Sequence, residues 1–156
     1  QSLLEWNQSM QELNLADDHR IGNTRYPIGL VAHVRLTYYN YIFFIYMRSV
    51  FSLVDKDMGD RYPDIKILTD AITGVNTVTD ILEREKQLLA PWWYTLSSLF
   101  CTGCLCLLFI SNNIQLNKMT AELAKVIRKV TLIAEDGRFV MAKECLWSLK
   151  TLNHML

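Results

Sequence analysis

The chain has 156 residues, of which 51% are hydrophobic, and this is enough apolar material for one domain with its own core. Its 16 basic residues equal its 16 acidic residues, so the sequence lacks the positive excess that gathers nucleic acid or anionic membranes non-specifically. These counts argue against a disordered tail and against a dedicated nucleic-acid-binding domain.

With six glycines and three prolines the chain has few turn residues, which favours helices over many short strands. The first predicted helix begins at Ser2, which forms a capping box with Glu5. Its apolar residues recur at helical spacing and predict one buried stripe, made of Leu3, Trp6, Met10 and Leu13. A polar loop over 16–26 follows, and Pro27 suits the first turn of a second helix that runs to about Val54.

The charged segment 55–64 predicts a connection in solvent, and the third helix after it ends in the charged run 83–86. A fourth helix over 92–110 is apolar on all sides and carries no charge, so it must lie either in a protein core or in lipid. We favour a buried core, because the segment contains four serine and threonine residues and because the amphipathic helices need an apolar centre. A small membrane protein anchored by residues 92–110 is the alternative.

Two further amphipathic helices are predicted over about 116–134 and 142–152, separated by Asp136-Gly137. Residues 1–156 therefore form a single all-α domain in this interpretation, an array of about six antiparallel helices around one apolar central helix. Because the chain begins with glutamine and shows no signal peptide, we expect it to be a piece of a longer polypeptide.

Few residues are arranged for catalysis or metal binding. Cys101, Cys104 and Cys106 have the short spacing of zinc or redox thiols, but they lie in the apolar fourth helix, where Cys106 points away from the other two. We interpret them, with Cys145, as small core residues in a reducing compartment. The three histidines are isolated, and no phosphate loop or nucleophile motif occurs. The sequence predicts no catalytic residue, no metal site and no cofactor in this chain.

Two surface features could bind a partner or a ligand. Lys118, Lys125 and Lys129 recur at spacings that place them on one helix face, which we interpret as a solvated face, with a strip for phosphates as the alternative. Aromatic residues surround the second helix, so some belong to the core and others could line a groove or pocket. The candidate groove or effector contacts are Tyr38, Tyr41, Phe44, Arg48, Trp92 and Trp93.

The order of these elements resembles the middle homology region of fungal transcription factors that carry a binuclear zinc cluster. A first helix containing Leu4-x-Trp6 precedes the Tyr-rich second helix. Positions similar to the family's second-helix pattern are Leu36, Tyr39, Asn40 and Arg48. The sequence departs from the pattern at Ser49, where the family usually has proline, and over 73–75, near an expected cysteine and alanines. The resemblance covers about residues 3–152.

The resemblance implies a non-enzymatic regulatory domain of a nuclear transcription factor, of which this chain is the C-terminal part. It implies contacts with other parts of the parent chain, with transcriptional regulators or coactivators, with a small-molecule effector or with a second copy as a homodimer. DNA would be bound, and zinc held, by a cysteine cluster outside this sequence. A helical scaffold subunit of the same architecture is the alternative within the resemblance.

Overall fold

A computed structural model of the chain describes residues 20–21, 24–25, 27–51, 62–89 and 92–156. The bounds of its elements are β1 Arg20–Ile21, β2 Thr24–Arg25, α2 Ile28–Phe51, α3 Tyr62–Arg84, α4 Trp92–Ser111, α5 Leu116–Glu135 and α6 Val140–His154. The all-α prediction is confirmed. The helix expected over residues 2–13 lies outside the described residues, so the array of six helices stays a prediction.

A short hairpin interrupts the predicted polar loop. Arg20 pairs with Arg25 and Ile21 pairs with Thr24 in antiparallel register. The prediction of a loop was incomplete here, because two residues per strand are too few for an alternating hydrophobic pattern to show in the sequence. The hairpin lies directly before α2.

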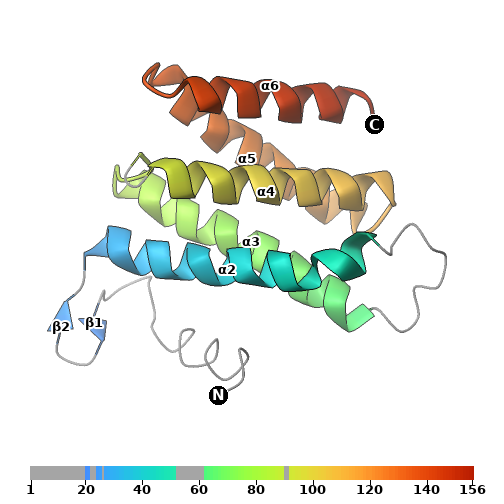
Figure 1. The fold of residues 1–156 in the computed structure, drawn as a ribbon, viewed down its shortest axis with the longest axis horizontal. Helices are drawn as coiled ribbons and strands as arrows, with labels where there is room; N and C mark the ends of the chain where they lie inside the picture. Colours follow the sequence, from blue (N-terminus) through green and yellow to red (C-terminus); the bar gives the residue numbers. More distant parts are fainter. Residues whose placement is uncertain (1–19, 22–23, 26, 52–61, 90–91) are drawn as a thin grey trace.

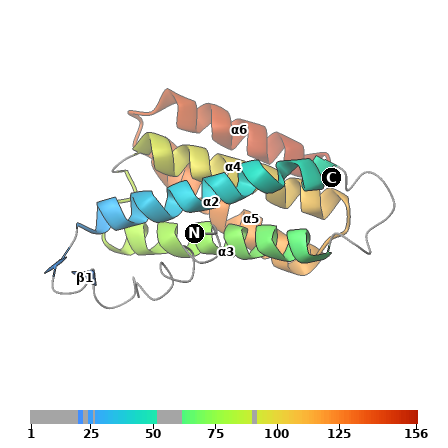
Figure 2. The same cartoon turned by 60° about the horizontal axis from the view of Figure 1, so that its bottom comes forward.

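The described helices pack in two layers. α2, α4 and α6 lie side by side in one layer, and α3 and α5 form the second layer behind it (Figure 1 and Figure 2). In Figure 1 α2, α4 and α6 begin on the left, whereas α3 and α5 begin on the right. Each connection therefore reverses the direction of the chain.

α4 is the central helix of the described part, since it contacts each of the other four helices. The buried hydroxyls of Ser98 and Thr102 are compatible with a central position of α4, because both form hydrogen bonds within this helix. Ser98 Oγ donates to the carbonyl of Tyr94 at 2.8 Å, and Thr102 Oγ1 donates to the carbonyl of Ser98 at 2.7 Å. Among the described helices, the stretch Trp93–Ser111 is the one long and apolar enough to cross a membrane, and 56% of it is buried. The core helix of a soluble protein has the same length and composition.

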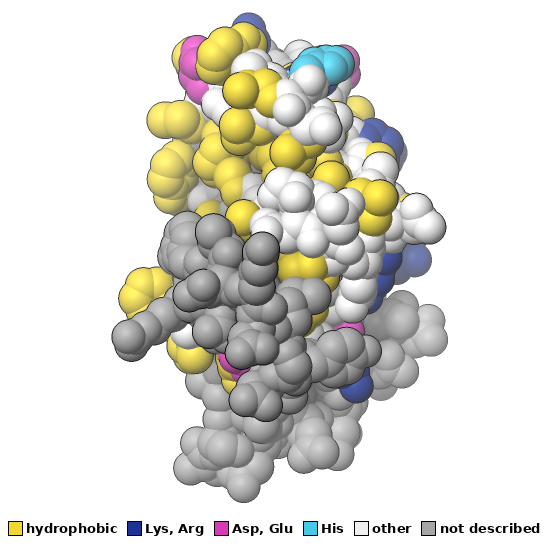
Figure 3. Space-filling model, turned by 90° about the vertical axis from the view of Figure 1, so that its right-hand side faces the viewer, with side chains coloured by type: hydrophobic (Ala, Val, Ile, Leu, Met, Phe, Trp, Pro, Cys, Tyr) yellow, Lys and Arg dark blue, Asp and Glu magenta, His cyan; other side chains and the backbone are white. Residues whose placement is uncertain are grey.

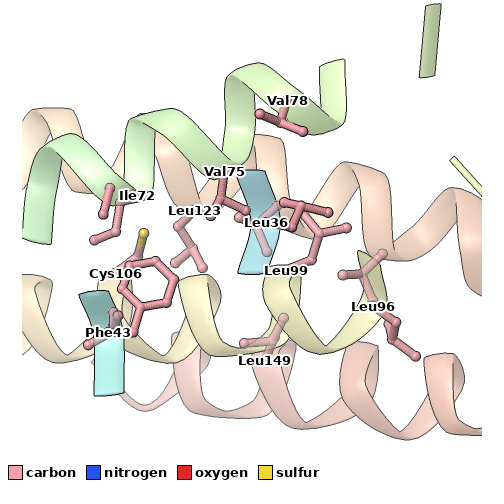
Figure 4. Packing of buried hydrophobic residues seen from close by; sticks show 14 of the residues in the cluster. Leu36, Phe43, Ile72, Val75, Val78, Leu96, Leu99, Cys106, Leu123 and Leu149 are labelled. Carbon is pink, nitrogen blue, oxygen red and sulfur yellow. The ribbon is translucent and has the colours of Figure 1, made fainter. Parts of the chain in front are cut away.

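Every described helix contributes to one apolar core. Figure 4 shows residues of this core from all five helices, including Leu36, Phe43, Ile72, Val75, Val78, Leu96, Leu99, Cys106, Leu123 and Leu149. Two glycines let helices approach closely. A Cβ at Gly74 of α3 would collide with the ring of Tyr39 on α2, and one at Gly103 of α4 would lie 2.7 Å from Leu149 Cδ2 on α6. At these two positions the core is therefore packed by a glycine of one helix against a side chain of the neighbouring helix.

Candidate functional site

The predicted groove residues separate into different environments. Tyr38 is 7% exposed and packs against Tyr39, with the ring centroids 5.3 Å apart. Burial raises the pKa of both phenols, so both stay neutral at physiological pH. The side chains of Arg48 and Trp92 lie outside the described residues. Tyr38 is therefore part of the core, and a partner cannot reach it without rearrangement.

Three of the predicted residues are exposed on the first layer. Tyr41 and Phe44 of α2 are 59% and 75% exposed, and Trp93 of α4 is 54% exposed. Leu30 and Ile45 extend the apolar surface of α2, with about half of each residue exposed. Large apolar side chains that are exposed together, rather than singly, are typical of a contact surface.

The apolar surface continues across the other two helices of this layer. On α4 the residues at the solvent side follow helical spacing and carry no charge: Trp93, Ser97, Phe100, Cys101, Cys104 and Leu108. On α6 the exposed residues Met141 and Leu152 lie on one side of the helix. We define the apolar face as the exposed apolar residues Leu30, Tyr41, Phe44, Ile45, Trp93, Cys101, Met141 and Leu152.

The second layer exposes more charge than α2 and α4 do, although Leu116 and Leu132 of α5 are also exposed. The exposed charged residues of α3 and α5 are Lys66, Asp70, Asp80, Arg84, Lys118, Lys125, Arg128 and Glu135. In Figure 3 hydrophobic side chains gather on one side of the view and Lys and Arg side chains on the other. The outer side of α3 and α5 therefore carries more charge than that of α2 and α4, whereas α6 of the first layer also exposes Lys143, Glu144 and Lys150.

A shallow depression lies on the outer side of α6. Lys143, Glu144 and Trp147 line it, and the indole of Trp147 is exposed. An exposed tryptophan beside two charged groups is suited to a small contact with a partner. The depression contains no arrangement of side chains that would perform catalysis.

Lys129 occupies a place that the sequence interpretation did not predict. It is fully buried, so the interpretation of a solvated lysine face is wrong for this residue, although Lys118 and Lys125 are exposed. A signal for burial was present in the spacing, since Lys129 lies three residues after Val126 and four before Ile133, and both of these apolar residues are buried.

Lys129 is the centre of a polar network between α3 and α5. Its Nζ donates to the carbonyl oxygen and to Oδ1 of Asn76 at 2.8 and 3.1 Å, and to Thr79 Oγ1 at 2.9 Å. Asn76 Nδ2 in turn donates to Glu122 Oε2 at 2.6 Å, and Lys125 Nζ donates to Glu122 Oε1 at 2.9 Å. These groups satisfy one another, so the network fits a structural role that fixes the position of α3 on α5.

The four cysteines are free thiols. Cys106 is fully buried, and burial raises its pKa to about 12, while burial and the neighbouring thiols raise that of Cys104 to about 11. The interpretation of small core residues holds for Cys106 but is wrong for Cys101, which is exposed. Within the described residues, no three or more His, Cys, Asp or Glu side chains are arranged to hold a metal ion.

Among known proteins, the chain is similar to the probable transcriptional regulatory protein STB4 of the yeast Saccharomyces cerevisiae. The two are 24% identical over 148 residues, which cover 89% of this chain and 15% of the relative. The chain thus spans less than a sixth of that protein's length. No family model and no solved structure matches the sequence. The similarity relates the chain to a region of a transcriptional regulatory protein.

Proposed function

We propose that this chain is a non-enzymatic regulatory domain of a fungal zinc-cluster transcription factor. The observation that carries the proposal is the similarity to the yeast regulatory protein, which extends over 89% of the chain rather than over one motif. The resemblance of the helix order to the middle homology region supports it. DNA binding and zinc belong, in this proposal, to a part of the polypeptide outside this sequence, and the polypeptide acts in the nucleus.

The proposed domain acts through the apolar face. Exposed aromatic residues such as Tyr41, Phe44 and Trp93 supply much of the binding energy when they are buried in an interface. The partner in this proposal is another part of the parent chain, a transcriptional regulator or coactivator, or a second copy. A small-molecule effector would act by changing that contact, which requires a two-state surface rather than catalytic groups.

A membrane anchor is the second candidate, favoured by the length and apolar composition of Trp93–Ser111. The contacts of α4 with all four other described helices support the core interpretation instead, as do the fully buried Ser98 and Thr102. We therefore place the regulatory domain first.

The proposal is tested with the complete polypeptide that contains this chain. Fused to a heterologous DNA-binding domain, it is assayed on a reporter gene that carries the matching DNA sites, with Phe44→Ser and Trp93→Ser introduced together. Both side chains are exposed, so the fold is retained, and we expect reporter transcription to change at least about threefold. The control is Lys118→Met, an exposed change on the charged layer.

Two results would overturn the proposal. If transcription is unchanged in the double variant while the same variant no longer retains a partner protein in a pull-down, the scaffold subunit is favoured. The lack of a six-cysteine cluster anywhere in the complete polypeptide would remove the zinc-cluster assignment.

A further inference from the structure

The apolar face is one continuous surface over the three helices of the first layer. Between α2 and α4, Asn40 Nδ2 donates a hydrogen bond to Ser98 Oγ at 2.9 Å. Between α4 and α6, the thiol of Cys145 lies close enough to Cys101 and Cys104 for electrostatic interaction among the three. α4 is therefore the middle of the face, which is turned toward the viewer in Figure 1.

The parts of this face on α2 and α4 carry almost no charge. α4 contains no Lys, Arg, Asp or Glu residue at all. Over residues 28–46 of α2 there is a single such residue, Arg35, and it is half-buried. The front of Figure 1 is seen from the side at the left of Figure 3, and hydrophobic side chains gather there.

α6 contributes one side to the face and carries its lysines on the other. Lys143 stands two residues after Met141, and Lys150 stands two residues before Leu152. At 3.6 residues per turn, both lysines therefore point about 200° away from these two members of the face. Glu144 is exposed at the edge of the face, where it lines the outer depression. An apolar centre with polar groups at the rim is the usual arrangement of a protein interface.

The exposed area of the apolar face equals one side of a protein interface. Tyr41, Phe44 and Trp93 alone expose between 54% and 75% of their surface. At about 150–250 Å² for a large side chain, the eight residues of the face together expose roughly 800 Å². Each partner contributes about 800 Å² to a standard interface, whereas the largest apolar patch on a typical monomer measures about 300–600 Å².

Composition discriminates among the partners that the proposed function leaves open. Contacts between domains of one chain, and transient contacts with another protein, are about as polar as the rest of a protein surface. Interfaces of homodimers are more apolar, and their centres are depleted of charge. An uncharged face also meets its own copy without repulsion, which a two-fold symmetric interface requires. These properties favour a second copy of this chain as the partner.

We propose that two copies of this chain pair through the apolar face, with α4 of one copy lying across α4 of the other. This inference rests on the proposed function, because it assigns a partner to the face through which the domain is proposed to act. Cys101 lies midway along α4 and is exposed. The two-fold axis of the pair passes close to this residue, so the two Cys101 thiols lie near each other.

The first test is the mass of the purified chain in solution, measured by analytical ultracentrifugation at about 1–100 μM. We expect twice the 18.1 kDa of one chain. Phe44→Asp places an unpaired charge in the interface from both copies and should weaken pairing at least about 30-fold. Trp93→Asp is a second variant with the same expected effect. Trp147→Asp, an equally exposed aromatic change on the outer side of α6, is the matched control and should leave the mass unchanged.

The second test locates the interface by cross-linking. A short bismaleimide should join two chains through Cys101, and mass spectrometry should find the tryptic peptide that contains residue 101 joined to a second copy of itself. Cys101→Ser should abolish this product. Cys145→Ser, a change to a half-buried thiol of α6, is the control and should retain it. Circular dichroism of every variant shows that the helices are intact.

The remaining outcomes separate this proposal from the proposed function. A monomer at every concentration overturns the pairing, while a reporter that still responds to the double change at Phe44 and Trp93 keeps the proposed function with a different partner. A pair that survives both Phe44→Asp and Trp93→Asp places the interface elsewhere and also overturns the inference. Binding of the chain to phosphatidylcholine vesicles in place of pairing identifies lipid as the cover. Pairing as expected with an unresponsive reporter removes the proposed function and leaves the pair.

Discussion

The Nζ of Lys129 lies 2.7 Å from Asp80 Oδ1, although Lys129 is fully buried and the Asp80 side chain is 49% exposed. The carboxylate keeps part of its hydration, so only one of the two ions is fully desolvated. Burial lowers the pKa of Lys129, and the hydrogen bond with Asp80 acts in the opposite direction. The ion pair reaches the surface through Asp80, and its lysine anchors α5 to α3.

We expect Lys129→Met to lower the free energy of unfolding by about 1–3 kcal/mol, because Asn76 Oδ1 would lose its donor while buried. The measurement is urea denaturation of the purified chain at pH 7. Lys118→Met, on the exposed side of the same helix, is the control and should change the free energy by less than about 0.5 kcal/mol. Equal effects of the two changes would contradict the buried position of Lys129.

The second prediction concerns Arg128, whose guanidinium donates two hydrogen bonds to the Glu83 carboxylate at 2.5 and 2.6 Å. These hydrogen bonds lower the pKa of Glu83 from its ordinary value of 4.5. A lowered acid pKa stabilises the fold above the unfolded value, and this contribution disappears as the pH falls through the folded value. At pH 7 Arg128→Gln should therefore cost about 0.2–1 kcal/mol, a small effect because the pair is partly exposed.

Urea denaturation of the Arg128→Gln variant at pH 7 and pH 3 gives the comparison. The difference from the unchanged chain should shrink as the pH falls below 4.5, because the Glu83 carboxylate takes up a proton once the pH passes its lowered pKa. A difference of the same size at both pH values would show that Arg128 acts through packing rather than through its charge.

The spacing of apolar residues was sufficient to predict the described helices. α4 was expected over 92–110 and is found at Trp92–Ser111, because proline and a continuous apolar run define it. The partners of polar side chains could not be predicted in the same way. Asn76 and Lys129 are 53 residues apart, and they meet only because of the angle and offset at which α3 packs on α5. Hydrophobic spacing contains no information about that offset.

The candidate contact residues were predicted with the same limitation. An aromatic sequence over 38–46 shows that α2 must bury some rings and expose others, but not which ones. The position of α3 decides this, since Tyr39 packs over Gly74 and Tyr38 faces inward beside it. Tyr41 and Phe44 are exposed because they lie on the opposite side of the helix.

A third prediction tests the burial of α4. Ser98 is fully buried and its Oγ accepts a hydrogen bond from Asn40 Nδ2 at 2.9 Å. Ser98→Arg would bury an unpaired charge, so it should cost several kcal/mol and unfold most of the chain at room temperature. Ser98→Ala is the control, with an expected cost of about 1 kcal/mol. Circular dichroism during heating gives both values, and an unchanged melt of Ser98→Arg would show that the position is exposed.

The cysteines supply the fourth prediction. With iodoacetamide at pH 8, Cys101 should be alkylated first because it is exposed, and Cys106 should stay unmodified until the chain is unfolded. Mass spectrometry of tryptic peptides measures the order. Burial raises the pKa of Cys106 from 9.0 to about 12, so its contribution to stability is present below pH 9 and is lost as the pH rises towards 12. Early modification of Cys106 would mean that α4 opens readily.

The contact between Tyr39 and Gly74 ties together two positions that are distant in the sequence. A side chain larger than hydrogen at position 74 needs the space that the phenol ring occupies, so α3 would have to move away from α2 or residue 39 would have to become smaller. The two positions are therefore free to change in evolution only as a pair. In related sequences, the residue at one of them should report the size of the residue at the other.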